Sequence, residues 1–155
     1  MIISISGTPG TGKTEVAKKV AEKLDFEYVS LNEIAEEKDL YVGYDEERKC
    51  RIVDTDAISE ELRKRKDKNL VIESHYAHDI YSDIRIILTC QLKELRKRME
   101  KKGWPEKKIE ENMDSEIMEV IRSDTIESGN EFHEIDNSED IEDTVREIVE
   151  IVKQQ

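Results

Sequence analysis

The chain has 155 residues, of which 41% are charged, and its 38 acidic against 25 basic residues give a net charge of −13. This length predicts one compact domain with its own buried core. An acidic surface repels phosphate backbones, so the composition argues against extensive direct binding to nucleic acid. No apolar run approaches membrane-spanning length and the opening residues are too few for a signal peptide, so we expect a cytoplasmic protein with no membrane partner.

Short apolar runs alternate with longer periodic segments along the chain, which is typical of a parallel sheet with connecting helices. Residues 31–53 do not read as one regular element, and we expect an excursion from the core there. In the segment KKGWPEKK, residues 101–108, Gly103 fits the position beyond a helix end and Pro105 fits the first turn of the next helix. The five predicted strands are residues 2–6, 26–30, 70–73, 84–89 and 131–136.

Apolar residues at spacings of three or four predict helices between these strands. One helix is expected to run unbroken from residue 109 through residue 121. Together with the strands, the helices predict an α/β domain with a five-stranded parallel sheet covered on both faces. The stripes are Val16, Val20 and Leu24; Leu92, Leu95 and Met99; Ile109, Met113, Ile117 and Ile121; and Ile141, Val145, Ile148 and Val152.

Residues 7–14, GTPGTGKT, match the pattern G-x-x-x-x-G-K-[ST] and lie between a predicted strand and a predicted helix. Glycines allow the backbone amides to point at phosphate oxygens, and the start of the helix adds its positive dipole end. Lys13 is expected to supply a point charge to the β- and γ-phosphates, and the Thr14 hydroxyl can ligate Mg²⁺. The motif predicts a P-loop protein that binds a nucleoside triphosphate such as ATP.

Glu73 and His75 follow the carboxyl end of the predicted strand 70–73. Ligands of parallel sheets bind at the carboxyl ends of strands, where the P-loop also begins. If the two strands are neighbours, Glu73 points towards Mg²⁺ and His75 stands near the γ-phosphate. An apolar run that closes on an acid is typical of a Walker-B strand.

Other acids and histidines admit simpler interpretations. One of Asp54 and Asp56 is expected to cap a helix, while a role in binding Mg²⁺ through water stays open for the other. We expect no metal site from His75 and His78, because no nearby cysteine completes a ligand set. His78 is predicted to lie in a surface loop, and His133 in the core or at a sheet edge.

Three segments then carry a resemblance: residues 40–62, LYVGYDEERKCRIVDTDAISEEL; residues 71–79, VIESHYAHD; and residues 98–118, RMEKKGWPEKKIEENMDSEIM. Together with the P-loop they resemble the small adenylate kinase/ATPase family that includes the coilin-interacting nuclear ATPase and its archaeal relatives. The resemblance covers nearly the whole chain in order.

This resemblance implies a nucleoside-monophosphate-kinase-like fold, with a monophosphate-binding excursion at residues 31–53 and a short lid at residues 101–108. It implies transfer of phosphate from ATP to AMP, together with ATP hydrolysis. It also implies a role in small ribosomal subunit assembly, through binding of a basic small-subunit ribosomal protein. The acidic balance of the chain is compatible with such a partner.

The resemblance also implies roles for individual residues. Lys13, His75 and Arg98 are the implied catalytic residues, with His75 important for hydrolysis and Arg98 on the helix that leads into the lid. Glu73, where relatives often carry aspartate, and Thr14 are implied at the Mg²⁺ site. The implied nucleotide-binding residues are Gly7, Thr8, Gly10, Thr11, Gly12, Lys13, Thr14, Lys102 and Asn137.

The chain departs from the family at three positions. Lys102 replaces an arginine that covers the adenine, and lysine keeps the charge but loses planar stacking. Glu36 replaces an arginine for the monophosphate, so AMP phosphorylation requires another cation. Tyr76 replaces a small glycine. The basic residues of the excursion that could substitute for the lost arginine are Lys38, Arg48 and Arg51.

Two rival functions remain open from the sequence. One is a nucleotide-gated assembly factor that hydrolyses ATP with little AMP kinase activity, which Glu36 and the acidic surface favour. The other is a metabolic kinase for a small acceptor such as shikimate, which shares the P-loop and an Asp-x-Asp like Asp54–Asp56. The resemblance elsewhere favours the adenylate kinase interpretation.

Overall fold

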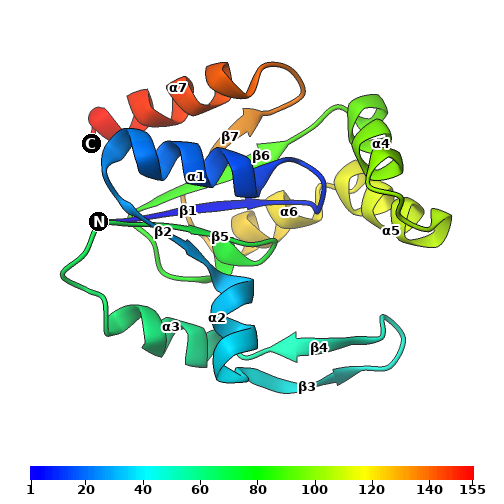
Figure 1. Cartoon of the computed structure of the whole chain (residues 1–155), viewed down its shortest axis with the longest axis horizontal. Coiled ribbons are helices and arrows are strands. Elements are labelled where there is room, and N and C mark those ends of the chain that lie inside the picture. The colour runs from blue at the N-terminus through cyan, green and yellow to red at the C-terminus, as the bar shows by residue number, and fades with distance from the viewer.

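The computed structural model describes all 155 residues and has a five-stranded parallel sheet at its centre (Figure 1). The strand order is β2-β5-β1-β6-β7, so the strand that leads into the P-loop lies directly between β5 and β6. All five predicted strands are confirmed. Their bounds are β1 Ile2–Gly7, β2 Glu27–Ser30, β5 Leu70–Glu73, β6 Ile84–Thr89 and β7 His133–Asp136.

Helices cover both faces of the sheet, as the alternating pattern predicted (Figure 1). On one face, α1 (Lys13–Leu24) and α7 (Ile141–Lys153) bury their apolar stripes against the strands. The other face carries α2 (Leu31–Lys38), α3 (Thr55–Arg63) and the short 3₁₀ helix η1 (Ala77–Asp79). Each fully buried aliphatic side chain contributes about 1.5–3 kcal/mol. No helix combines the length and apolar character needed to cross a membrane.

The segment after β2 leaves the sheet, as expected for residues 31–53. Helix α2 is anchored by Leu31 and Ile34 in the core of the second face. An antiparallel hairpin then follows, made of β3 (Tyr41–Asp45) and β4 (Cys50–Val53), and it forms a separate two-stranded sheet. In Figure 1 this hairpin projects from the body of the molecule beside α2.

The segment at residues 101–108 joins two helices. Helix α4 (Leu92–Lys101) is followed by Gly103 at φ 72°, the left-handed conformation expected just beyond a helix end. Pro105 immediately precedes α5 (Glu106–Ile117), close to its predicted place. Trp104 packs beside the small apolar cluster that joins α4 to α5.

The prediction of one helix from residue 109 through residue 121 is wrong. Helix α5 ends at Ile117, Glu119 takes a φ of 49°, and a separate helix α6 (Val120–Glu127) begins. Only Ile109 of the predicted stripe is fully buried, while 56% of Ile117 is exposed. The apolar contacts of α5 with α4 end at Met113, so no core packing holds the chain in one helix beyond Ile117.

The prediction of a surface position for His78 is also wrong. The residue lies in η1 and is only 4% exposed, and neither ring nitrogen has a hydrogen-bond partner. Burial lowers the pKa of His78, so the ring is neutral at pH 7. The loop folds back under the sheet because Ala77 and Ile80 join the core there. His133, expected in the core or at an edge, is exposed on the edge strand β7.

Candidate phosphoryl-transfer site

The P-loop conformation depends on two glycines. Gly10 and Gly12 have φ values of 100° and 89°, which other residues adopt only with strain. A Cβ atom on Gly12 would lie 2.7 Å from Nδ2 of Asn137, so there is also no space for a larger residue. The loop therefore keeps its backbone amides and the first turn of α1 open towards a ligand, which fits a polyphosphate.

Arg98 and Asn137 hold the P-loop from behind. The Asn137 amide is buried; its Nδ2 donates to the Thr11 carbonyl at 2.8 Å, and its Oδ1 accepts from the Thr144 hydroxyl at 2.8 Å. The Arg98 guanidinium donates to the same Thr11 carbonyl at 3.2 Å and to the Asn137 carbonyl at 2.7 Å. These bonds tie the loop to α4 and α7. Arg98 also donates from Nε to Glu94 at 3.2 Å, and its side chain lines the nucleotide cavity.

A cavity of about 830 Å³ opens between the P-loop, α4 and the start of α7. Four cations line this cavity, against three acids, Glu15, Glu139 and Asp140. Lys102, implied at the adenine, is one of these cations, and its Nζ lies 5.2 Å from the ring centroid of Trp104. Trp104 was not among the predicted nucleotide-binding residues. The cationic lining residues are Lys13, Arg98, Lys101 and Lys102.

Glu73 and Thr14 meet at the edge of the P-loop. The Thr14 hydroxyl donates to Oε1 of Glu73 at 3.2 Å, and the Tyr28 hydroxyl donates to the same oxygen at 2.9 Å. Oε2 of this buried carboxylate makes no hydrogen bond within the chain. Carboxylate and hydroxyl oxygens are the ligands that Mg²⁺ prefers, so Thr14 and Glu73 fit a magnesium site.

Lys13 lies beside this carboxylate. Burial lowers the pKa of Lys13, an effect that the charge of Glu73 opposes and the charge of Lys102 reinforces. Lys13 is thus a partly dehydrated cation within the electrostatic range of both Glu73 and Lys102. Such a charge interacts strongly with a phosphate oxygen, because little water remains to screen it.

His75 follows the carboxyl end of β5 by two residues and is exposed at the surface near Lys13. Crowding removes part of its hydration and, with the nearby charge of Lys13, lowers the pKa of His75 to about 4. The ring is therefore neutral at pH 7 but a weak base, and the negative charge of a bound phosphate, which raises this pKa, is needed to make it an effective proton acceptor. Its neighbour Tyr76, which replaces a family glycine, packs its ring into the core. The centroids of the Tyr76 and His75 rings lie 5.1 Å apart in an edge-to-face arrangement.

Some predicted residues do not face the nucleotide cavity. Gly7, Thr8 and Thr11 are buried, and the Thr11 hydroxyl donates to the Thr8 carbonyl at 2.8 Å, so these residues shape the loop from inside. Asp54 accepts a hydrogen bond at 3.0 Å from the Ala57 amide and caps α3, which confirms capping for one of the two acids.

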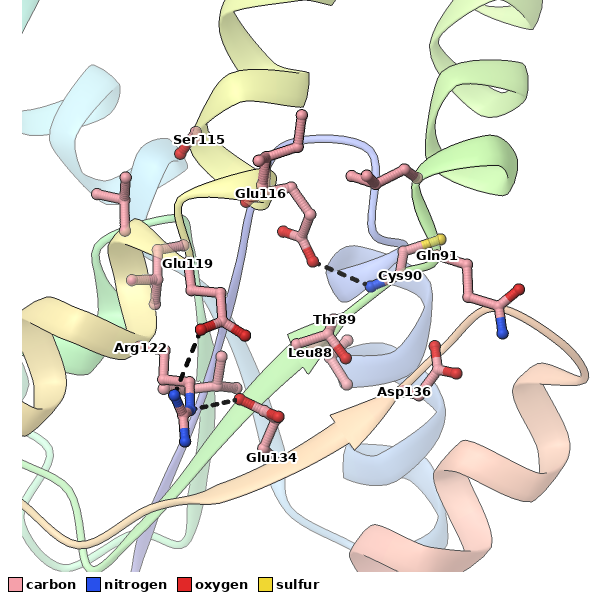
Figure 2. Close-up of a pocket in the computed structure, with 16 residues that line it drawn as sticks. Leu88, Thr89, Cys90, Gln91, Ser115, Glu116, Glu119, Arg122, Glu134 and Asp136 are labelled. Carbon is pink, nitrogen blue, oxygen red and sulfur yellow. Dashed lines mark hydrogen bonds and ion pairs between the residues drawn. The ribbon is translucent and has the colours of Figure 1, made fainter.

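Thr8 instead lines a second cavity, of about 410 Å³, beyond the ends of β6 and β7 (Figure 2). Figure 2 shows Glu116 accepting from the Cys90 amide at 3.2 Å. Arg122 lies between Glu119 and Glu134, with contacts of 3.3 and 3.2 Å. These four side chains therefore already interact within the chain.

Glu36, the acid at the implied monophosphate site, is neutralised within the excursion. Its carboxylate pairs with Arg51 at 2.8 Å and accepts from the Tyr41 hydroxyl at 3.1 Å. The Arg51 guanidinium also stacks over the Tyr41 ring at 4.0 Å and reaches Asp39 at 3.4 Å. Arg51 is thus engaged in compensating the acid, which leaves it poorly placed to receive a phosphate as well.

The parallel sheet, the glycine-dependent phosphate loop and the acid on the neighbouring strand define a P-loop protein with a nucleotide kinase fold. Solved structures share this fold. A shikimate kinase from Bacteroides thetaiotaomicron superposes with a TM-score of 0.67 at 18% identity, covering 99% of this chain and 98% of that one. A deoxyadenosine kinase from M. mycoides gives 0.64 at 16% identity over the full length of both chains.

Sequence relatives define the family more closely. A family model described as "AAA domain" matches residues 3–119. A "Putative adenylate kinase" from Methanosarcina acetivorans is 34% identical over 98% of this chain and 86% of its own length. A protein of the same description from Thermococcus kodakarensis is 35% identical over 99% of this chain and 86% of its own. The chain belongs to this adenylate kinase-like family of P-loop proteins and is a nucleotide kinase.

Proposed function

We propose that this nucleotide kinase transfers the γ-phosphoryl group of ATP to AMP and hydrolyses ATP when water takes the place of the acceptor. The observation that carries the proposal is the convergence of Lys13, Thr14 and Glu73 at the carboxyl ends of β1 and β5, beside His75. The relatives that carry the name adenylate kinase supply the substrate class.

The chain contributes mainly position and charge. The loop amides and Lys13 bind the β- and γ-phosphates, and Arg98, which lines the cavity, keeps the loop in its binding conformation. Mg²⁺ held by Thr14 and Glu73 would supply further charge neutralisation on the phosphate oxygens. A loose transition state with charge spread over the phosphoryl oxygens needs little covalent help from the protein.

ATP turnover by the purified chain tests this proposal. ADP formation is measured with ATP and Mg²⁺ alone, then with each nucleoside monophosphate, then with a basic small-subunit ribosomal protein. Strong acceleration by AMP, with equal conversion of AMP to ADP, is the expected result. Absence of AMP phosphorylation in the presence of active ATP hydrolysis would remove the adenylate kinase assignment.

Substitution of His75 by alanine is expected to lower ATP hydrolysis about 10²-fold, because the ring, once bound phosphate has raised its pKa, takes a proton from the attacking water. ATP affinity should stay within about twofold of the wild-type value. NMR titration of the nucleotide-free protein should give His75 a pKa near 4, and bound phosphate charge should raise that pKa. His133→Ala, an exposed histidine on β7, is the control; equal loss of hydrolysis and ATP binding in His75→Ala contradicts the role.

Arg48 is the cation of the excursion that we assign to the acceptor phosphate. Lys38 pairs with Glu61 at 2.9 Å and Arg51 neutralises Glu36, whereas the Arg48 guanidinium makes no ion pair in the chain. Its amide donates to Asp45 in the hairpin tip, and its charge contributes to lowering the pKa of His75.

Replacement of Arg48 by alanine is expected to raise the KM for AMP about tenfold, the effect of one lost charge-assisted hydrogen bond. The KM for ATP should not change. The neighbouring Lys49→Ala removes the same charge from the same hairpin tip and serves as control. An unchanged KM for AMP in Arg48→Ala, or an equal rise in both variants, would contradict the assignment.

We further infer that the chain acts in small ribosomal subunit assembly by binding a basic small-subunit ribosomal protein. The family resemblance and the net charge of −13 support this partner. A second function is favoured by the pairing of Glu36 with Arg51, which withdraws one cation from the acceptor site: in it, ATP hydrolysis only times release of the partner. Stimulation of ADP formation by the ribosomal protein but not by AMP would favour that second function.

A further inference from the structure

Tyr28 lies on the edge strand β2 and reaches the metal side of the P-loop. Strand register places Tyr28 beside Val71 and Ser30 beside Glu73, so Tyr28 is the diagonal neighbour of Glu73 on one face of the sheet. Diagonal neighbours are within reach of each other when one side chain is aromatic. The Tyr28 hydroxyl accordingly donates to Glu73 Oε1 at 2.9 Å.

The Tyr28 ring is itself held in place. It packs at the border of the core beneath α1, the helix that carries Thr14 at its first turn. On its outer side, Nζ of Lys18 lies 5.5 Å from the ring centroid. These contacts fix the direction from which the hydroxyl approaches Glu73.

Two hydroxyl donors share one oxygen of Glu73. Thr14 and Tyr28 both donate to Oε1, which leaves Oε2 without a hydrogen-bond partner in the chain. Glutamate has one more rotatable bond than the aspartate that is common at this position, so its carboxylate needs an additional constraint to keep one orientation. Tyr28 provides that constraint independently of the P-loop threonine.

We propose that Tyr28 is a positioning residue that fixes the Glu73 carboxylate with Oε2 towards Mg²⁺, and thereby sets the metal affinity of the nucleotide complex. The proposal rests on the proposed function only in requiring that a metal–nucleotide complex binds at the P-loop. It does not require AMP as acceptor or water as nucleophile.

Tyr28→Phe tests the proposal, because it removes the hydroxyl and keeps the ring. Mn²⁺ replaces Mg²⁺ as a paramagnetic probe, and electron paramagnetic resonance measures its Kd for protein saturated with a non-hydrolysable ATP analogue. The expected result is a Kd for Mn²⁺ raised about tenfold, with analogue binding in EDTA unchanged. The half-saturating Mg²⁺ concentration for turnover should rise in parallel.

Tyr81→Phe is the matched control, since Tyr81 is 69% exposed and donates its hydroxyl to Asp83, outside the candidate site. Glu73→Asp supplies a second comparison, because a shorter carboxylate no longer reaches the Tyr28 hydroxyl. The effects of Tyr28→Phe and Glu73→Asp on the Kd for Mn²⁺ should therefore be strongly non-additive.

Three outcomes decide the matter. A lower unfolding midpoint for Tyr28→Phe with an unchanged Kd for Mn²⁺ would overturn the proposal and assign the hydroxyl to stability alone. Additive effects of the two substitutions would also overturn it. A raised Kd for Mn²⁺ supports the proposal even if the wild-type chain fails to phosphorylate AMP, so the two assignments fail separately.

Discussion

Replacement of Lys13 by methionine is expected to lower kcat for phosphoryl transfer about 10³-fold, because the charge that stabilises the γ-phosphoryl in the transition state is lost. The same substitution should raise the thermal unfolding temperature of the nucleotide-free protein. Burial holds the pKa of Lys13 below its ordinary value in the folded state, so the charged lysine opposes folding at pH 7. Methionine fills similar space without that charge.

The pH dependence of the unfolding free energy tests whether the charged Lys13 destabilises the folded protein. The unfolded chain binds the Lys13 proton more tightly than the folded chain, so wild-type stability should rise as pH increases from the lowered pKa towards the ordinary value. The stabilisation by Lys13→Met should shrink over the same interval in calorimetry. Lys23 is an exposed lysine in the last turn of α1, and the control substitution Lys23→Met should change neither kcat nor the unfolding temperature. Retention of wild-type kcat in Lys13→Met would refute the assigned role.

Replacement of Gly12 by alanine is expected to lower ATP affinity at least 100-fold. The positive φ of 89° adds strain of about 1–2 kcal/mol, and the new Cβ would lie 2.7 Å from Asn137 Nδ2. Asn137 cannot yield without losing its bonds to Thr11 and Thr144, so the loop must move instead. Titration of the variant with ATP measures the effect directly.

Gly129→Ala is a control that introduces the same kind of backbone strain as Gly12→Ala without a steric clash of the new Cβ atom. Gly129 has a φ of 73° and no atom within 4 Å of its virtual Cβ. Its substitution should cost about 1 kcal/mol of stability and leave ATP binding intact. Equal ATP affinity in Gly12→Ala and the wild type would contradict the prediction, because it would show that the P-loop accommodates the new Cβ atom and still binds phosphate.

The sequence predicted the sheet and the phosphate loop well because both depend on local patterns. Buried strands produce short apolar runs, and the P-loop needs glycines at fixed spacing beside Lys13 and Thr14. The acid at the end of β5 was predictable for the same reason, since the strand ends there. The prediction of Glu73 near the loop needed only the assumption that its strand lies beside β1, which the strand order confirms.

Other features depend on contacts between distant segments and leave little local trace. The hydroxyl of Tyr28 meets Glu73 only because β2 pairs with β5. The burial of His78 follows from how η1 packs, although the segment looks like a polar loop. The helix break at Glu119 was missed because isoleucines at spacings of four continue across it.

The shared carbonyl of Thr11 also limits how the molecule can move. Arg98, near the end of α4, donates to this carbonyl, so displacement of the whole helix would loosen the phosphate loop. Movement of residues 101–108 over a bound nucleotide is therefore expected to pivot after Arg98. Gly103 is the natural hinge, because it has a left-handed backbone and nothing within 4 Å of its Cβ position. If this segment closes over a nucleotide, as the family resemblance implies, the floor of the nucleotide cavity would stay in place, held by Arg98.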